Sequence, residues 1–472
     1  MLEGLEIVEL KLSELQNENW TFRFDSEYFK KIYLKNLECL KNYSNGYLKL
    51  SNEIVHMSGG ATPLGANYQE SGVPFLRVQN IMQNYFSLTD IVFLSKEQDE
   101  EIKRSRLKER DVLLTITGVS YGKSTVVSQK LKGANINQHS VKITLSENIN
   151  PYFLSTFLNS SFGKLQSDKN VIGVTRPALD YQVIRDFTIP KLSILFQNKI
   201  EVVIKKSEAL TAHSEVAYSQ AEQLLLEELG LKDWQPSTEN INSKSFKESF
   251  LVTGRLDAEY YQPKYEEILN HLQNFSTKKL GDIVDIKKSI EPGSDAYQES
   301  GIPFIRVANI SKLGITDTDI YLDKSEYQTY ELKPKKDTIL LSKDGSVGIA
   351  YKVEKDLDII TSGALLHLSI IDNNFLPDYL TLVLNSLIVK LQAERDAGGS
   401  IIQHWKPSEI EQVIIPLLNT ERQQEISSLI QKSFTLKHQS EHLLEIAKRS
   451  VEIAIEEDEK KAIEYIKENT IT

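Results

Sequence analysis

Cysteine is almost missing from this sequence, and so are the signals of secretion and membrane insertion. The single cysteine, Cys39, excludes an internal disulfide bond and any zinc site built from several cysteines. No apolar run approaches the roughly 18 residues that a membrane-spanning helix needs. The N-terminal stretch MLEGLEIVEL is acidic, whereas a secretory signal begins with basic residues. We therefore expect a cytoplasmic protein with no membrane partner.

The common motifs of catalysis are also missing. The sequence contains no H-E-x-x-H, G-x-S-x-G or G-x-G-x-x-G segment and no Asn/Asp-Pro-Pro-aromatic signature of amino-group methylation. Its eight histidines are scattered without ligand-like pairing, which argues against a metal site. The segment GVSYGKS at 118–124 resembles a phosphate-binding loop, but it is one residue too short between its glycines. We interpret it as a turn at the end of a strand, and we expect that the chain alone catalyses nothing.

What the sequence does contain is an internal duplication. YQESGVPFLRVQNI at 68–81 returns as YQESGIPFIRVANI at 297–310, with 11 of 14 positions identical. Other segments recur in the same order, at separations that drift only from 232 to 226 residues: RFDSEYF and RLDAEYY, DVLLTITGVSYG and DTILLSKDGSVG, LNSSFGKLQ and LNSLIVKLQ. A period this long, present twice, indicates two copies of one domain.

Each copy has a mixed pattern and is followed by a long helical segment. Runs such as VPFLRV and HSVKITL predict strands, and NPYFLSTFLNSSFGKLQ has helical spacing, so each copy is predicted to be an α+β domain. Residues 195–229 contain neither proline nor glycine and place apolar residues at helical intervals, as do the residues after Pro416. The simplest interpretation is a coiled-coil-like pair of long helices, although each helix could instead pack on its own domain.

These patterns give a predicted division of the chain into five parts. The parts are an N-terminal segment with the first domain at 1–190, a first long helix at 191–232, a linker at 233–250, a second domain at 251–416 and a second long helix at 417–472.

The net charge of −11 argues at first against a nucleic-acid partner, but the charge is unevenly spread. Residues 20–190 carry 21 Lys and Arg against 16 Asp and Glu, whereas residues 251–419 carry 18 against 25. A basic block in the first half is compatible with DNA binding, and the acidic second half is in tension with it.

The repeated phrases resemble the DNA-specificity subunit of Type I restriction–modification systems. The phrases that carry the resemblance are RLDAEYYQPKY, SGIPFIRVANI, LSKDGSVGIA, INQHSVKI and IIPLLNTERQQEI, and their doubled order covers nearly the whole chain. One departure is that residues 192–196 lack the usual acidic-Gln start of the first long helix. The resemblance implies an α+β fold with two tandem pseudo-symmetric target recognition domains, separated by two long antiparallel coiled-coil-like helices. The implied function is that of a non-catalytic subunit that reads a bipartite DNA target and directs methylation and restriction by partner subunits.

The resemblance also implies partners and cofactors. The expected partners are double-stranded DNA, two modification (methyltransferase) subunits and two restriction (translocase and nuclease) subunits. No cofactor is expected in this chain, since S-adenosylmethionine, ATP and Mg would belong to the partner subunits. Two alternatives stay open: a non-enzymatic protein-binding scaffold, suggested by the acidic second half, and a specificity subunit of a methylation-only system. Salt-dependent DNA binding separates the scaffold from the others, and the neighbouring reading frames separate the methylation-only system.

Residues that read bases are predicted where the two copies differ, because identical residues cannot easily distinguish two half-sites. The candidates in the first copy are Tyr121, Lys123, Gln138, His139, Thr175 and Arg176, and those in the second copy are Lys343, Gln403, His404 and Lys406. Arg and Lys suit guanine edges and Gln suits adenine. Arg104 and Arg106, in the basic run KRSRLKER, are predicted to contact phosphate.

Residues shared by both copies are expected to have a different role. Arg77 and Arg306, with Asn80 and Asn309, should shape the domains or hold phosphate. An internal salt bridge and a turn cap are equally good interpretations of these two pairs.

Overall fold

The computed structural model describes residues 7–13, 23–88, 90–173, 177–239, 241–328, 333–398 and 403–470. The chain forms two compact units: unit 1 comprises Met1–Thr211 with Lys437–Thr472, and unit 2 comprises Ala212–Leu436. The division cuts two long helices, α7 (Ile194–Glu228) and α13 (Thr420–Glu456), so that each unit includes part of both. The predicted parts, by contrast, treat the long helices as separate from the domains.

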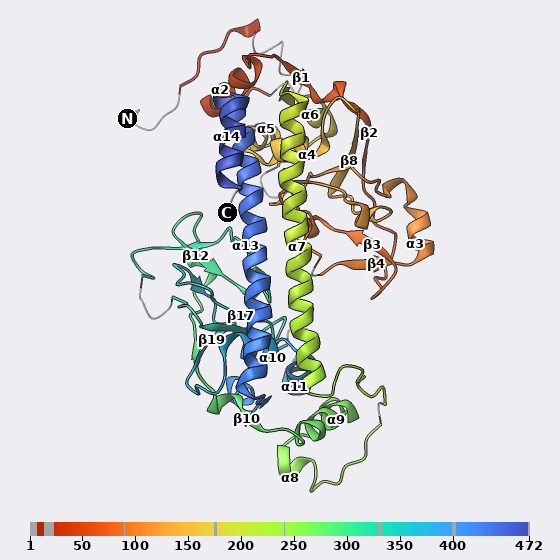
Figure 1. Cartoon of the computed structure of the whole chain (residues 1–472), viewed down its shortest axis with the longest axis vertical. Helices are drawn as coiled ribbons and strands as arrows, with labels where there is room; N and C mark the ends of the chain where they lie inside the picture. The colour runs from red at the N-terminus through yellow and green to blue at the C-terminus, as the bar shows by residue number, and fades with distance from the viewer. Residues whose placement is uncertain are drawn as a thin grey trace. The chain divides into compact units, whose positions relative to one another are not determined.

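Unit 1 is an α+β domain built on small sheets (Figure 1). Its strands are ordered β2-β8-β5-β6 in one sheet, β4-β3-β7 in a second and β1-β9 in a third. The strands are β1 (Tyr47–Lys49), β2 (Ile54–Gly59), β3 (Val73–Leu76), β4 (Val92–Leu94), β5 (Val112–Thr115), β6 (Ser124–Val126), β7 (Asn135–Ile136), β8 (Ser140–Leu145) and β9 (Thr188–Pro190). The shorter helices are α2 (Lys31–Lys41), α3 (Lys96–Glu101), α4 (Pro151–Asn159), α5 (Ser161–Asn170) and α6 (Tyr181–Arg185).

The segment predicted as one helix from its apolar spacing forms two helices in unit 1, α4 and α5. Asn150 caps α4 by accepting a hydrogen bond from the backbone N–H of Tyr152 at 2.9 Å, and Pro151 occupies the first helical position. Phe153 and Phe157 on α4 are fully buried in the core that includes strands β5 and β8. Ser160 interrupts the helix in extended conformation, and its backbone N–H still bonds to the carbonyl of Phe157.

Unit 2 repeats the strand order of unit 1. Its sheets are ordered β11-β19-β16-β17, β15-β12-β18 and β10-β20, with an additional β13-β14 pair. The strands are β10 (Thr277–Lys279), β11 (Val284–Lys288), β12 (Ile302–Ile305), β13 (Ile310–Ser311), β14 (Gly314–Ile315), β15 (Tyr321–Leu322), β16 (Ile339–Ser342), β17 (Ala350–Lys352), β18 (Ile360–Thr361), β19 (Leu365–Ile370) and β20 (Ile414–Pro416). The shorter helices are α8 (Phe250–Thr253), α9 (Pro263–Leu272), α10 (Pro377–Leu384), α11 (Leu387–Asp396) and α12 (Pro407–Ile410).

The common topology confirms that the sequence repeat is a domain duplication. The parallel pairing of β3 with β7 aligns Phe75 with Asn135, and its counterpart in unit 2, β12 with β18, aligns Phe304 with Ile360. Both units also place a two-strand pair, β1-β9 or β10-β20, directly before their long helix.

The long helices pair with each other and also complete the domain cores. In unit 1, Ser207 of α7 and Ser440 of α13 are buried and lie Oγ to Oγ at 2.7 Å, and in unit 2 Ser214 and Ser433 lie at 3.0 Å. From one serine pair to the next, the residue number increases along α7 and decreases along α13, so the helices are antiparallel. Apolar residues of the same helix parts join the cores, for example Ile200 in unit 1. Pairing and packing on the domain, offered by the sequence as alternatives, therefore occur together.

The two long helices differ in how well the sequence predicted them. The predicted helix at 195–229 is α7, Ile194–Glu228, with 35 residues, and the part bounded at 191–232 extends beyond this helix at both ends. The single helix predicted at 417–472 is wrong, because α13 ends at Glu456 and a separate helix, α14, spans Glu459–Asn469. Asp458 adopts extended conformation between them, and its carboxylate accepts a hydrogen bond from the backbone N–H of Lys461 at 2.8 Å. A strong N-cap residue thus starts a new helix where apolar periodicity suggests continuation.

Candidate nucleic-acid interface

A glycine-rich turn follows the same strand in both units and will be called the strand-end turn. It spans residues 116–122 after β5 and residues 343–348 after β16. Gly118 and Gly122 have φ of 76° and 85°, and Gly345 and Gly348 have 74° and 83°. Only glycine adopts this left-handed conformation without strain, which explains why the two turns share their glycines and little else. The prediction that GVSYGKS forms a turn at the end of a strand is confirmed.

A second segment, the tied loop, closes against the strand-end turn in unit 2. Its two ends are Gly398 and His404, whose backbones exchange hydrogen bonds of 3.1 and 2.7 Å, and residues 399–402 between them lie outside the described residues. The backbone N–H of Gly345 in the strand-end turn donates to the carbonyl of Gln403 at 2.9 Å, and that of Trp405 donates to the carbonyl of Lys343 at 2.8 Å. Trp405 is fully buried, so the exit of the loop is anchored in the core of unit 2.

Unit 1 has the same framework at its tied loop. Ile172 and Ala178 exchange backbone hydrogen bonds of 3.0 and 2.9 Å, and the N–H of Gly118 donates to the carbonyl of Pro177 at 3.0 Å. The buried Leu179 takes the place of Trp405 and donates to the carbonyl of Ile116 at 2.8 Å. The frameworks match while the sequences between the tied ends, GVTRP and GSIIQ, differ. Thr175 and Arg176, two of the predicted base readers, lie outside the described residues.

The predicted residues of the second copy come together at this framework. His404 is 63% exposed at its side chain, and its Nδ1 lies 2.8 Å from a carboxylate oxygen of Asp344. The ammonium of Lys343 pairs with the other oxygen of Asp344. Burial raises the pKa of Asp344, but hydrogen bonds from Lys343 and His404 outweigh it and lower the pKa below the usual range. Gln403 is exposed, and Lys406 is exposed and pairs with Glu409 at 3.3 Å.

The predicted residues of the first copy that the structure describes are one exposed residue and three half-buried ones. Gln138 is exposed and accepts a hydrogen bond from Thr62, and the half-buried His139 lies with Nδ1 2.6 Å from the hydroxyl of Thr117 in the strand-end turn. Tyr121 is also half-buried, and its hydroxyl donates to Asp168 at 2.8 Å. Lys123 is half-buried as well, with its ammonium 3.9 Å from the sulfur of Met82.

The two arginines predicted to contact phosphate differ in their surroundings. Arg104 is exposed, and among the described residues it forms no ion pair. Burial raises the pKa of Tyr181, at the start of α6, and the positive charge of Arg104 partly counteracts this rise. Arg106 is already occupied, because its guanidinium bonds to both carboxylate oxygens of Asp99 and, at 2.6 Å, to Glu100. The geometry favours Arg104 over Arg106 as a phosphate ligand.

Arg77 and Asn80, identical in the two copies, have a structural role. The side-chain oxygen of Asn80 accepts from the backbone N–H of Arg77 at 2.9 Å, and Asn309 does the same for Arg306 at 3.0 Å. The guanidinium of Arg77 donates to the carbonyl of Asp90 at 2.7 Å. The interpretation as a turn cap is confirmed for both copies.

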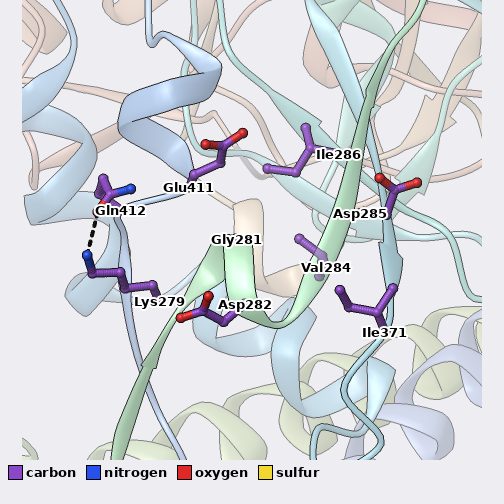
Figure 2. A pocket seen from close by; sticks show the side chains of 9 residues that line it. All are labelled: Lys279, Gly281, Asp282, Val284, Asp285, Ile286, Ile371, Glu411 and Gln412. Atoms are coloured by element: carbon purple, nitrogen blue, oxygen red, sulfur yellow. Dashed lines mark hydrogen bonds between the residues drawn. The ribbon is translucent and has the colours of Figure 1, made fainter.

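Unit 2 also has a pocket that the sequence did not suggest. Its volume is about 460 Å³, and Figure 2 shows it beside strand β11, with the ammonium of Lys279 bonded to the side-chain oxygen of Gln412 at 2.7 Å. Asp282, Asp285 and Glu411 also line it. Three carboxylates against one lysine give a surface that repels phosphate, so the pocket does not extend the candidate interface.

The described residues provide neither a metal site nor a membrane-spanning helix. No three His, Cys, Asp or Glu side chains of the described residues are grouped so that they could hold a metal ion. No helix within those ranges is both long and apolar enough to cross a bilayer.

Comparison with known proteins connects this geometry to a family. The family model described as "Type I restriction modification DNA specificity domain" matches residues 273–446, which include the strand-end turn and tied loop of unit 2. Over these residues the chain is similar to the Type I DNA-specificity family. The resemblance seen in the repeated phrases is thereby confirmed, and the common topology of the units relates unit 1 to the matched domain. No curated protein sequence shows significant similarity to the chain.

Several solved structures match the chain at low sequence identity and low TM-score. The S subunit of a Type-I restriction-modification system from M. genitalium is 12% identical, with a TM-score of 0.35, over 90% of this chain and 96% of that chain. The HsdS subunit from Thermoanaerobacter tengcongensis is 16% identical, with a TM-score of 0.28, over 87% and 96%. The type IIG restriction endonuclease BpuSI is 11% identical, with a TM-score of 0.31, over 38% and 28%. All three TM-scores are below 0.5, so the family assignment depends on the sequence match.

Two parts of the candidate interface were missed by sequence reasoning. Asp344 bonds to both Lys343 and His404, but in its segment only Lys343 was predicted as a site residue. Arg23 and Arg255, in the repeated R-x-D segments, contact the helix that leads into each tied loop. Their recurrence in both copies was the signal that could have identified them.

Proposed function

We propose that the chain is the DNA-reading subunit of a Type I restriction–modification complex and that each unit reads one part of a bipartite target. The observation that supports this most is that the two units share the backbone framework of the tied loop but differ in its sequence. Both units tie a loop to a strand-end turn by equivalent backbone bonds, yet the enclosed sequences GVTRP and GSIIQ are unrelated. A scaffold of fixed geometry with variable side chains is suited to reading two different half-sites.

The proposed base readers are polar side chains at this framework. In unit 2 they are Gln403 and His404, of which His404 is oriented by Asp344. In unit 1 they are Gln138 and His139, together with the sequence-predicted Thr175 and Arg176. A glutamine amide can pair with both major-groove atoms of adenine, and an arginine with those of guanine, which makes these residue types selective. Tyr121 and Lys343 are assigned a supporting role, since each is bonded to a neighbouring carboxylate.

Phosphate contacts are assigned to cations that lack a carboxylate partner. Arg104 is the first choice in unit 1. Each phosphate that such a residue neutralises adds affinity without sequence preference, through release of bound counterions. The excess of acidic residues at 251–419 would then make unit 2 depend more on its base contacts than unit 1 does.

Catalysis is assigned to partner subunits. Two modification subunits would supply S-adenosylmethionine-dependent methylation, and two restriction subunits would supply ATP- and Mg-dependent translocation and cleavage. The duplication supports two equal attachments, because a chain with two similar halves offers the same surface twice to identical partners. The chain itself would hold no cofactor.

The test is selection of DNA by the full-length chain from a pool of duplexes with a randomised stretch, followed by sequencing. We expect enrichment of two short conserved blocks separated by a gap of fixed length and unconserved sequence. The variant Gln403→Ala should relax one block and leave the other unchanged. Enrichment of a single continuous block would contradict the bipartite reading. Binding without any salt dependence, or no DNA binding at all, would favour a protein-binding scaffold.

A further inference from the structure

An arginine, an aspartate and a tyrosine from the repeated R-x-D-x-E-Y segment form the same cluster in both units, which we call the Arg–Asp clamp. In unit 2, the guanidinium of Arg255 makes a two-pronged pair with Asp257, with distances of 2.9 and 2.6 Å. Its remaining nitrogen, Nη1, donates to the carbonyl of Asp396 at 3.4 Å. Both Arg255 and Arg395 lie over the ring of Tyr260, at 4.4 and 5.1 Å from the centroid.

Unit 1 has the same arrangement with different neighbours. Arg23 pairs with Asp25 through two bonds of 2.7 Å, and its Nη1 donates to the carbonyls of Lys169 and Val171 at 3.3 and 3.4 Å. The Arg23 guanidinium and the Lys169 ammonium lie 5.1 and 4.4 Å from the ring centroid of Tyr28. Each contact of the clamp in unit 2 thus has a counterpart here, although the helices that are clamped differ in sequence.

The carbonyls that the clamp binds lie one to three residues before the tied loop. Asp396 ends α11, and Gly398, the first tied residue, follows two positions later. In unit 1, Val171 directly precedes the tied residue Ile172. A helix ends with unpaired carbonyls and a partial negative charge, so an arginine is well suited to this position. The clamp therefore fixes the point at which each tied loop leaves its helix.

Arginine is required for this geometry, because one planar group must serve three acceptors. Two N–H groups bind the carboxylate side by side and a third reaches the helix carbonyl, an arrangement that the single ammonium of lysine cannot reproduce. The hydrogen bonds from Arg255 lower the pKa of Asp257, so the pair stays ionised near neutral pH.

Stability of the fold gives little reason for such a clamp. The side chains of Arg255 and Asp257 are 30% and 45% exposed, and exposed ion pairs contribute at most about 1 kcal/mol. Each unit has its own extensive core, including the buried helices α4 in unit 1 and α10 in unit 2. Both copies nevertheless have the clamp, at the one point where a common framework meets a divergent loop.

We propose that the Arg–Asp clamps are positioning devices for base discrimination: Arg255 with Asp257 sets the tied loop of unit 2, and Arg23 with Asp25 sets that of unit 1. The clamps touch no base themselves. They hold the described start of each loop. In unit 2 this start, Gly398, exchanges backbone hydrogen bonds with His404, so that Gln403 and His404 present their polar atoms to the base edges at a fixed distance. This inference rests on the proposed DNA-reading function.

The test compares Arg255→Lys and Arg23→Lys in the full-length chain, with a randomised duplex pool as the probe. The matched control is Arg449→Lys, which makes the same change in an exposed arginine of α13 that pairs with Glu452 and Glu456. For Arg255→Lys we expect the preference for one DNA block over mismatched sequences to fall about tenfold, as for one lost base contact. Arg23→Lys should do the same to the other block only, and Asp257→Asn should reproduce the effect of Arg255→Lys.

Three further measurements distinguish a positioning role of the clamps from a general structural role. Affinity for mismatched DNA, the dependence of that affinity on salt and the urea midpoint of unfolding should all stay at the wild-type values. The proposal is overturned if both blocks weaken together, if all sequences weaken equally, or if the lysine variants keep wild-type preference. Failure of the wild-type chain to select any sequence would instead contradict the proposed function.

Discussion

Ser207 and Ser440 are bonded to each other twice over in the buried contact between α7 and α13. Their hydroxyl oxygens lie 2.7 Å apart, and each hydroxyl oxygen is also within hydrogen-bonding distance of the backbone carbonyl of the other residue, at 3.1 and 3.0 Å. Ser214 and Ser433 repeat the arrangement seven residues away along each helix. Buried polar pairs at heptad spacing fix the register of paired helices, because any shift leaves hydroxyl groups without partners.

Breaking one serine pair should destabilise the protein. We expect Ser440→Ala to lower the free energy of unfolding by about 1–3 kcal/mol, since it leaves the Ser207 hydroxyl buried with fewer partners. Ser207→Ala combined with Ser440→Ala should cost less than the sum of the single changes, because the two side chains interact. Urea unfolding monitored by circular dichroism measures both effects. Ser428→Ala, at an exposed serine of the same helix, is the control and should change stability little.

Lengthening both helices by one heptad should widen the gap in the DNA target. Seven residues inserted between Leu210 and Thr211, and seven between Leu436 and Lys437, lie between the two serine pairs and leave both intact. The added length is about 10 Å at 1.5 Å per residue. At about 3.4 Å per base pair, the preferred gap should grow by about three pairs while both blocks keep their sequence.

The control for the heptad insertion adds the seven residues to α7 alone. This change misaligns the serine pairs and should destabilise the protein. Selection from the randomised duplex pool provides the measurement in each case. If the doubly lengthened chain folds and selects the original gap, the helices do not set the spacing.

Arg104 should contribute to DNA affinity without contributing to sequence preference. We expect Arg104→Gln to weaken binding of selected and mismatched duplexes by the same factor, and to reduce the slope of log affinity against log salt by about 0.9 if one phosphate contact is lost. Fluorescence anisotropy at several salt concentrations measures the slope. Arg449→Gln makes the same change in net charge on α13 and should leave the slope unaltered. A change in preference between sequences would show that Arg104 reads a base.

His367 should make unit 2 sensitive to acid. The residue is buried in β19 with Nε2 2.7 Å from the hydroxyl of Thr361, and burial lowers its pKa from 6.5 to about 4. In the unfolded chain His367 therefore becomes protonated below pH 6.5, whereas in the folded chain it stays neutral down to about pH 4. The contribution to stability is complete above pH 6.5 and falls as the pH drops through this window, by at most about 1.4 kcal/mol per pH unit.

Thermal melting at pH 7.5 and pH 5 tests the acid sensitivity. We expect His367→Gln to lose less stability between the two pH values than the wild type does, whereas His438→Gln, at an exposed histidine, should behave like the wild type. The equivalent strand position of unit 1 holds Lys142 and not a histidine, since Lys142 aligns with Leu113 as His367 aligns with Leu340, so this acid sensitivity belongs to unit 2. Equal acid sensitivity of the wild type and His367→Gln would exclude His367 as the cause.

Local pattern was enough to predict much of this molecule. The 35 residues of α7 were predicted to within one residue at each end, because apolar spacing without proline or glycine is a property of the segment itself. The glycines of the strand-end turns were correctly interpreted as turn residues, because positive φ is a local demand. The duplication could be seen from letters alone, and the matching strand orders confirm it.

Tertiary structure decided what brings the candidate interface together. Asp344 and His404 are 60 residues apart in sequence, and Arg23 lies 146 residues from Lys169, so no local pattern could pair them. The break at Asp458 also escaped prediction, since apolar periodicity continues across it and only the extended backbone of the cap shows that one helix stops. Sequence by itself determined the repeated scaffold through short-range backbone preferences. The folded chain alone determined which polar groups meet, because hydrogen bonds between distant segments depend on how the strands and helices pack.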